Sequence, residues 1–145
     1  EMDASADVVV VFGGTNDFGH GDAPIGKFTD NTVYTFYGAL HVLYRQLLER
    51  FPEKDIIVLT PLHRLSENVT INERGIPCEP LKKYVEAIRE VAEYYSLPVL
   101  DLWKMSGMQP SVDVIREKYM PDGLHPSDLG AAKIADKLRD FLISL

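Results

Sequence analysis

Three short apolar runs, rich in β-branched residues, most strongly limit what this chain can fold into. They cover residues 7–12, 55–60 and 98–103. The first two are apolar at successive positions rather than at alternate ones. This pattern is typical of parallel strands that are buried on both faces of a sheet.

Amphipathic helical patterns alternate with these runs. Apolar residues recur at three- and four-residue spacing over residues 35–51, 80–95 and 127–145. On the last of these we expect six residues to face inward, namely Leu129, Ala132, Ile134, Ala135, Leu138 and Leu142. Alternating strands and helices require crossover connections, so the chain is predicted to be an α/β protein, a three-layer α/β/α sandwich with a parallel sheet.

The composition favours one globular domain over residues 1–145. The chain shows no internal repeat, low-complexity tract or linker, and 46% of its residues are hydrophobic. Its net charge of −7 would repel the phosphates of nucleic acids, so we expect no nucleic-acid partner. The longest apolar run, residues 8–12, is much shorter than the roughly 20 residues of a membrane span.

Cysteine and histidine usage bears on compartment and cofactors. Cys78 is the only cysteine, which fits a reducing compartment, so we predict a cytoplasmic location and leave open a signal peptide upstream of residue 1. No histidine pattern has metal-ligand spacing, so neither a metal ion nor another cofactor is expected.

Two motifs lie where ligands bind in such folds, at the carboxyl ends of strands and before a helix. Gly14, Thr15, Asn16 and Asp17 follow the first predicted strand, and residues 122–126 (DGLHP) precede the last predicted helix. In the second motif a carboxylate three residues before a histidine can accept its Nδ1 proton. The other ring nitrogen can then act as a general base.

Together these motifs resemble those of the SGNH (GDSL-type) hydrolases, a family of esterases, lipases and deacetylases with a flavodoxin-like fold. The resemblance implies that Asn16 donates its side-chain amide to an oxyanion hole. It also implies that His125 is the general base and that Asp122 orients it. Gly14 and Thr15, beside Asn16, are expected to contact the substrate.

The family's nucleophile is a serine in a G-D-S motif on an earlier strand, and no serine of this chain has that context. The resemblance therefore implies that residues 1–145 lack the first βαβ portion of the fold, about 60 residues if each such unit takes roughly 30. The chain alone is predicted to be inactive. A missing N-terminal segment or a second chain would have to supply the nucleophile and complete the sheet, because the strand at residues 8–12 would otherwise be an apolar edge.

The remaining signals are weaker. Residues 21–27 match the first part of a phosphate-binding loop, but Phe28 stands where serine or threonine must hold magnesium. His63 follows the second predicted strand, so it is a candidate substrate-binding residue, although no spacing supports it. His41 is interpreted as a packing residue, and His20 as a residue of the pocket rim or of the solvated surface.

The sequence therefore predicts a hydrolase that acts on a small-molecule ester, an acylated sugar or a lipid. Its Ser-His-Asp triad would draw its serine from outside this chain. One alternative is a non-catalytic module that binds carbohydrate or another ligand on the same fold. A weaker alternative is a nucleotide-binding flavodoxin-like domain.

Overall fold

The computed structural model describes residues 2–145 and has an α/β architecture. The three strands are parallel and lie in the order β1-β2-β3. Along the chain, the elements are β1 (Val8–Phe12), α1 (Thr15–His20), α2 (Phe36–Arg50), β2 (Asp55–Leu59), α3 (Leu81–Tyr94), β3 (Val99–Leu100), α4 (Leu102–Met105), α5 (Asp113–Tyr119) and α6 (Asp128–Ser144).

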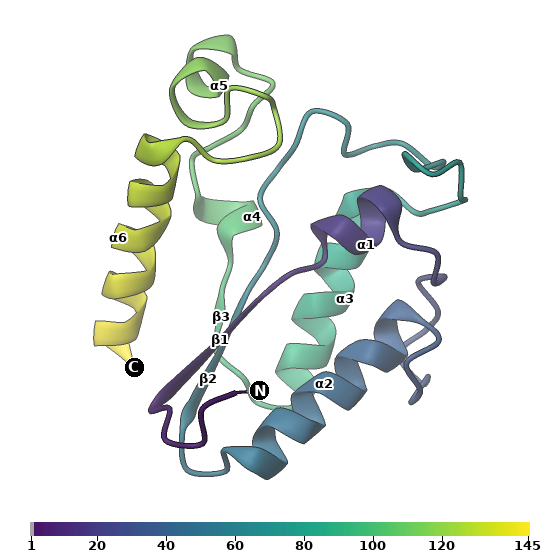
Figure 1. Ribbon diagram of the computed structural model, residues 1–145, viewed down its shortest axis with the longest axis vertical. Coiled ribbons are helices and arrows are strands. Elements are labelled where there is room, and N and C mark those ends of the chain that lie inside the picture. The colour runs from purple at the N-terminus through teal and green to yellow at the C-terminus, as the bar shows by residue number, and fades with distance from the viewer. Residues whose placement is uncertain (1) are drawn as a thin grey trace.

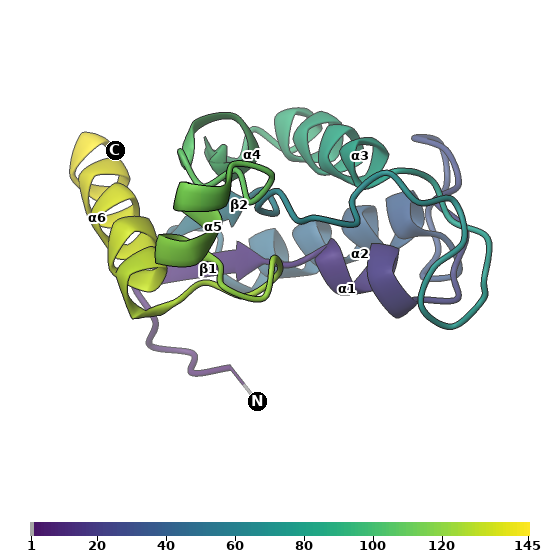
Figure 2. The ribbon, with the colours of Figure 1, turned by 90° about the horizontal axis from the view of Figure 1, so that it is seen from above.

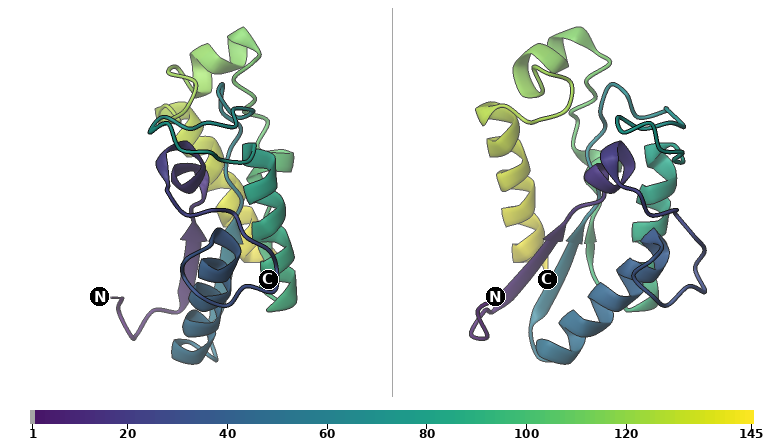
Figure 3. Two further views of the ribbon diagram at one scale, coloured as in Figure 1. Left: turned by 90° about the vertical axis from the view of Figure 1, so that its right-hand side faces the viewer. Right: turned by 45° about the vertical axis from the view of Figure 1, so that its right-hand side comes forward.

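The helices form layers on the two sides of the sheet (Figure 1), and a view turned by 45° separates the layers well (Figure 3). α2 and α3 cover one face, and α6 covers the other. Val9, Ile56 and Val58 belong to the larger core cluster, which includes the buried residues of α2 and α3. Ile57 and Leu59 belong to a second cluster, against which residues of α6 pack. The predicted three-layer α/β/α fold with a parallel sheet is confirmed.

The face of the sheet beneath α6 is covered unevenly. Val10 pairs in register with Ile57, and Phe12 with Leu59, so each pair lies side by side on that face. Ile57 and Leu59 are at most 2% exposed, whereas Val10 is 42% and Phe12 50% exposed. α6 therefore shields β2 and leaves β1 open, and β1 is also the margin of the described sheet, as the view from above shows (Figure 2).

The three predicted long helices are confirmed to within one residue at each end, and side-chain caps mark the starts of two of them, α2 and α6. The Thr35 hydroxyl accepts a hydrogen bond from the Gly38 N–H at the start of α2. Ser127 caps α6 by accepting one from the Gly130 N–H. Of the residues expected to face inward on α6, Ile134, Leu138 and Leu142 pack against the second cluster. The expectation was wrong for Leu129, which is 61% exposed, and for Ala132 and Ala135, which are also exposed.

The third strand is shorter than predicted. β3 contains only Val99 and Leu100, because Asp101 caps α4 by accepting a hydrogen bond from the Lys104 N–H. The short helices α1 and α5 carry too few residues for a periodic signal, and the sequence did not predict them. Within residues 2–145, none of the helices combines the length and the hydrophobicity that crossing a membrane requires.

Candidate active site

A pocket of about 410 Å³ lies at the carboxyl ends of β1 and β2. It brings together four of the residues singled out from the sequence, namely Gly14, Thr15, Asn16 and His125. The lining residues are Phe12, Gly13, Gly14, Thr15, Asn16, Asp17, Pro61, Leu62, Arg64, Leu124, His125 and Pro126. Segments from opposite ends of the chain thus meet at one cavity.

The turn between β1 and α1 places Asn16 at the pocket. Gly14 has a φ of +117°, a conformation that L side chains rarely adopt, and it is the residue before the first turn of α1. A Cβ at this position would also come within 3.0 Å of the Ile88 Cδ1. Glycine lets the chain reverse tightly here, so that α1 starts at Thr15 and Asn16 is exposed at the pocket wall.

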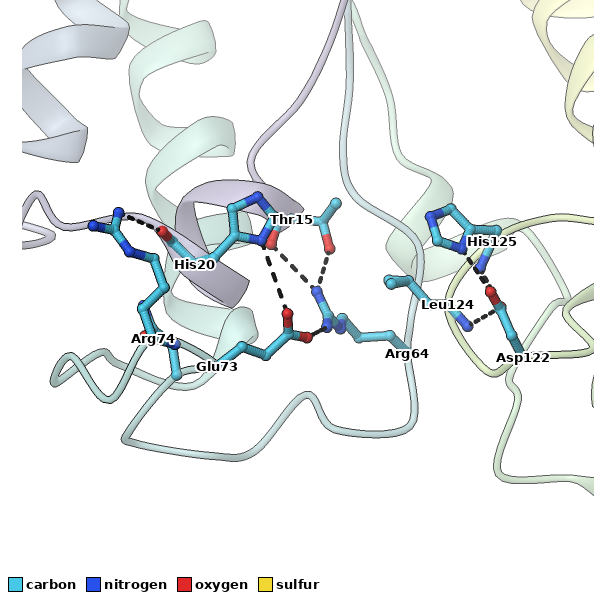
Figure 4. Close-up of polar contacts among 9 residues, drawn as sticks. Thr15, His20, Arg64, Glu73, Arg74, Asp122, Leu124 and His125 are labelled. Carbon is cyan, nitrogen blue, oxygen red and sulfur yellow. Dashed lines mark hydrogen bonds and ion pairs between the residues drawn. The ribbon is translucent and has the colours of Figure 1, made fainter.

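His125 and Asp122 form a closely bonded pair on the opposite side of the pocket (Figure 4). Nδ1 of His125 lies 2.6 Å from the Asp122 Oδ2. The other carboxylate oxygen accepts hydrogen bonds from the backbone N–H groups of His125 (2.7 Å) and Leu124 (2.8 Å). The His125 ring, together with these N–H groups, holds the pKa of Asp122 well below its ordinary value.

This geometry determines which nitrogen of the His125 ring can accept a proton from a bound molecule. An ionised carboxylate only accepts hydrogen bonds, so Nδ1 of His125 carries a proton, and in the uncharged form of the ring Nε2 has a free lone pair. The pair lies open to solvent, because the side chain of His125 is 75% exposed and that of Asp122 54%. His125 lines the pocket, so its ring can reach a bound molecule.

Arg64 also lines the pocket, and the sequence analysis did not identify it. It lies next to His63, the residue chosen from that loop, and only 7% of it is exposed. One sequence feature could have identified Arg64: it lies in the loop after the second predicted strand, and in this architecture such loops bind ligands. Arginine in a loop is ordinarily solvated, and only the fold shows that this one is buried.

The structure does not bring His63 to the pocket. Its Nδ1 lies 2.9 Å from the Glu67 Oε2, and its ring stacks on Trp103 with centroids 3.6 Å apart. These contacts turn the side chain away from the lining, in which His63 has no part. The buried His41 packs edge-on against Phe28, in agreement with its interpretation as a packing residue.

Two further features bear on the chemistry of the site: the pKa of Asp17, and whether side chains are grouped so that they could hold a metal ion. Desolvation raises the pKa of Asp17, one of the residues that line the pocket. Among residues 2–145, no three His, Cys, Asp or Glu side chains are grouped so that they could hold a metal ion.

The pocket lining in the described part of the chain contains no serine. Ser127 is the N-cap of α6: its hydroxyl donates to the Lys118 carbonyl and accepts from the Gly130 N–H. The hydroxyl of Ser106 accepts a hydrogen bond from the Met108 N–H. The pocket thus contains a candidate base and a candidate oxyanion donor, and its lining within residues 2–145 carries no serine nucleophile.

Comparisons with known proteins identify the family of the chain and support its fold. The model of the GDSL-like lipase/acylhydrolase family matches residues 2–133. No curated protein sequence matches the chain. One crystal structure with 35% sequence identity has a TM-score of 0.86, and the match covers 99% of this chain and 67% of that one.

Two other solved structures are also similar. A protein from Lactobacillus plantarum has 32% identity and a TM-score of 0.86, and the match covers 99% of this chain and 69% of that one. A lipase/acylhydrolase from Enterococcus faecalis has 26% identity and a TM-score of 0.60, with coverages of 91% and 58%. The chain therefore spans about two thirds of the length of the first two structures.

Proposed function

Because this chain belongs to the GDSL-like lipase/acylhydrolase family, a family of hydrolases, we propose that it supplies the general base and an oxyanion donor of a serine ester hydrolase. One observation carries the proposal: Asn16 and the His125–Asp122 pair converge on a single pocket from opposite ends of the chain. A base and an oxyanion donor on facing walls are the arrangement that acyl transfer requires.

His125 would move the protons of the reaction. Its Nε2 takes the proton of the attacking serine hydroxyl as the serine Oγ bonds to the ester carbonyl carbon. The same proton then passes to the leaving alcohol as the bond between the carbonyl carbon and the alcohol oxygen breaks. Water, deprotonated in turn by His125, attacks the acyl-serine, and the acid leaves as the serine hydroxyl is restored.

Asp122 and Asn16 would assist without forming bonds to the substrate carbon. Asp122 holds the ring tautomer in which Nε2 is free, and it stabilises the imidazolium that forms during attack. The side-chain amide of Asn16 would donate a hydrogen bond to the carbonyl oxygen as negative charge develops there. Donors of this kind typically contribute about 2.7–4 kcal/mol to the transition state.

We further propose that the serine comes from outside residues 2–145, on a segment of the same or of another chain that adds to the free edge of β1. Val8, Val10 and Phe12 leave an apolar strip open on this strand, which an added strand and its helix would cover. Phe12 ends β1 and lines the pocket, so a neighbouring parallel strand would end at the pocket as well.

The walls of the pocket favour an ester with an apolar acyl or alcohol group, such as a lipid or an acylated sugar. Its apolar residues are Phe12, Pro61, Leu62, Leu124 and Pro126. Five polar or charged side chains accompany them and can orient the ester, while the apolar surface provides affinity; they are those of Thr15, Asn16, Asp17, Arg64 and His125.

The test uses the full-length protein, a fluorophosphonate probe and p-nitrophenyl acetate. We expect one labelled serine, located outside residues 2–145, and ester hydrolysis that disappears in His125→Ala. His20→Ala is the matched control, since His20 is half exposed and lies outside the pocket lining. A full-length protein that neither reacts with the probe nor hydrolyses esters would contradict the proposal and favour a non-catalytic module that binds carbohydrate or another ligand.

A further inference from the structure

Arg64 makes contacts that a surface arginine does not make. Its Nη1 donates to the Thr15 carbonyl (3.3 Å) and to the Thr15 hydroxyl (3.2 Å). Its Nη2 donates to the Glu73 Oε1 at 3.1 Å, and its guanidinium lies over the Phe18 ring, 5.3 Å from the centroid. The planar fork of the guanidinium is thereby fixed from three sides. The close-up shows two of them, the hydrogen bonds to Thr15 and to Glu73 (Figure 4).

We propose that Arg64 is a positioning residue, which holds Asn16 in place through Thr15; this inference rests on the function proposed above. The carbonyl that Arg64 binds belongs to the peptide bond between Thr15 and Asn16. Because a peptide unit is planar, fixing this carbonyl also fixes the plane of the Asn16 N–H and the direction in which Asn16 leaves it. A donor in an oxyanion hole is effective only when it is oriented before the reaction begins.

The element that carries Asn16 needs such support. α1 contains six residues, and isolated helices of this length are unstable in water. The loop between β2 and α3 binds α1 at further points: the Glu73 N–H donates to the Gly19 carbonyl (2.9 Å), and Asn72 Nδ2 donates to the Gly21 carbonyl (2.8 Å). Arg64 is the member of this loop that acts at the end of α1 nearest Asn16.

Gly19 gives Arg64 the space it occupies. A Cβ on Gly19 would lie 2.9 Å from the Arg64 Nη1, closer than real Cβ contacts. The missing side chain thus lets the guanidinium reach past α1 to Thr15. The same position offers a way to displace Arg64 without changing its chemistry.

Lysine in place of Arg64 separates geometry from charge. Lysine keeps the positive charge but lacks the fork that binds the Thr15 carbonyl, the Thr15 hydroxyl and Glu73 together. If Arg64 acted only through its charge in the pocket wall, Arg64→Lys would retain activity. If it positions Asn16, lysine would not restore it.

The experiment measures kcat and KM of the full-length protein for p-nitrophenyl acetate. We expect Arg64→Lys to lower kcat roughly 10- to 100-fold, since a displacement of about 1 Å can cost about 10²-fold, with KM within about twofold. In an Asn16→Ala background, the same substitution should lower kcat by less than about threefold, because the group it positions is gone. Arg74→Lys is the matched control, since the side chain of Arg74 donates to the His20 carbonyl at the far end of α1, away from Asn16.

Further variants keep the inference testable if Arg64→Lys does not fold. Thr15→Val removes the hydroxyl that Arg64 binds, and Gly19→Ala displaces the guanidinium; each should lower kcat several-fold with KM unchanged. A normal kcat in Arg64→Lys, or an equal loss with and without Asn16, would overturn the inference alone. Wild-type protein without ester hydrolysis would overturn the proposed function and, with it, this inference.

Discussion

The pocket has two walls that are built in different ways: the Asn16 wall, with Thr15, Asn16 and Arg64, and the His125 wall, with Leu124 and His125. On the Asn16 wall, Arg64 is 7% exposed and is bound to Thr15, 49 residues away in the sequence. On the His125 wall, the side chains of the pair are 75% and 54% exposed, and their hydrogen bonds join residues at most three apart. The first wall is therefore organised by tertiary contacts, whereas the Asp122–His125 pair is held by local hydrogen bonds. The loop that carries the pair has its own tertiary contact, because the Leu65 N–H donates to the Gly123 carbonyl (3.0 Å).

This difference matters because solvent weakens charged interactions. A carboxylate–imidazole pair in water gains little from its charges, whereas a shielded pair gains several times as much. A segment added at the β1 edge, as proposed above, would reach this side of the pocket and exclude water from His125. The Asn16 wall already has its contacts within the described chain.

The largest expected effect falls on the exposed wall. Asp122→Asn in the full-length protein should lower kcat for p-nitrophenyl acetate by roughly 10⁴-fold, because an amide in place of the carboxylate favours the wrong tautomer of His125. The midpoint of thermal unfolding should stay within about 2 °C, since the pair is exposed and its bonds are local. Asp128→Asn, an exposed acid in the first turn of α6, is the control, and a loss below tenfold would contradict the role of Asp122.

A smaller loss is expected on the Asn16 wall. Asn16→Ala should lower kcat by about 10²–10³-fold and leave KM nearly unchanged, because the amide acts mainly on the charge that develops in the transition state. Asn68→Ala, at an exposed position of the loop between β2 and α3, should retain full activity. An increase in KM with normal kcat would instead make Asn16 a substrate-binding group.

The contrast between the walls also shows what the sequence could predict. The local features were found: the alternation of strands and helices, the helix starts at Thr35 and Ser127, and the pairing of Asp122 with His125. Arg64 was missed and His63 was chosen, because adjacent loop residues differ only in which side of the backbone faces the pocket. That choice depends on tertiary contacts with Thr15 and Trp103, which local patterns do not encode.

Stability should respond in the reverse order to activity. Arg64→Met should lower the free energy of unfolding by about 1–3 kcal/mol, because it removes buried hydrogen bonds between the β2–α3 loop and α1. His125→Ala should change it by less than about 0.5 kcal/mol, as is usual for an exposed side chain. Urea denaturation of both variants measures the difference. Equal losses of unfolding free energy in the two variants would show that Arg64 and His125 contribute equally to stability, which would contradict the difference between the two walls.

The smallest expected effect is the pH dependence that Asp122 adds to stability. Its pKa in the folded protein is lowered from an ordinary value of 3.8, first by the His125 ring and then by backbone N–H groups. A carboxyl whose pKa is depressed on folding stabilises the protein above its unfolded pKa, and this contribution is lost as the pH falls through the folded value. Between pH 6 and pH 3, the urea midpoint of the wild type should therefore fall slightly further than that of Asp122→Asn. Because the pair is exposed, added salt should reduce the difference, and identical pH profiles in low salt would mean that solvent already screens the pair completely.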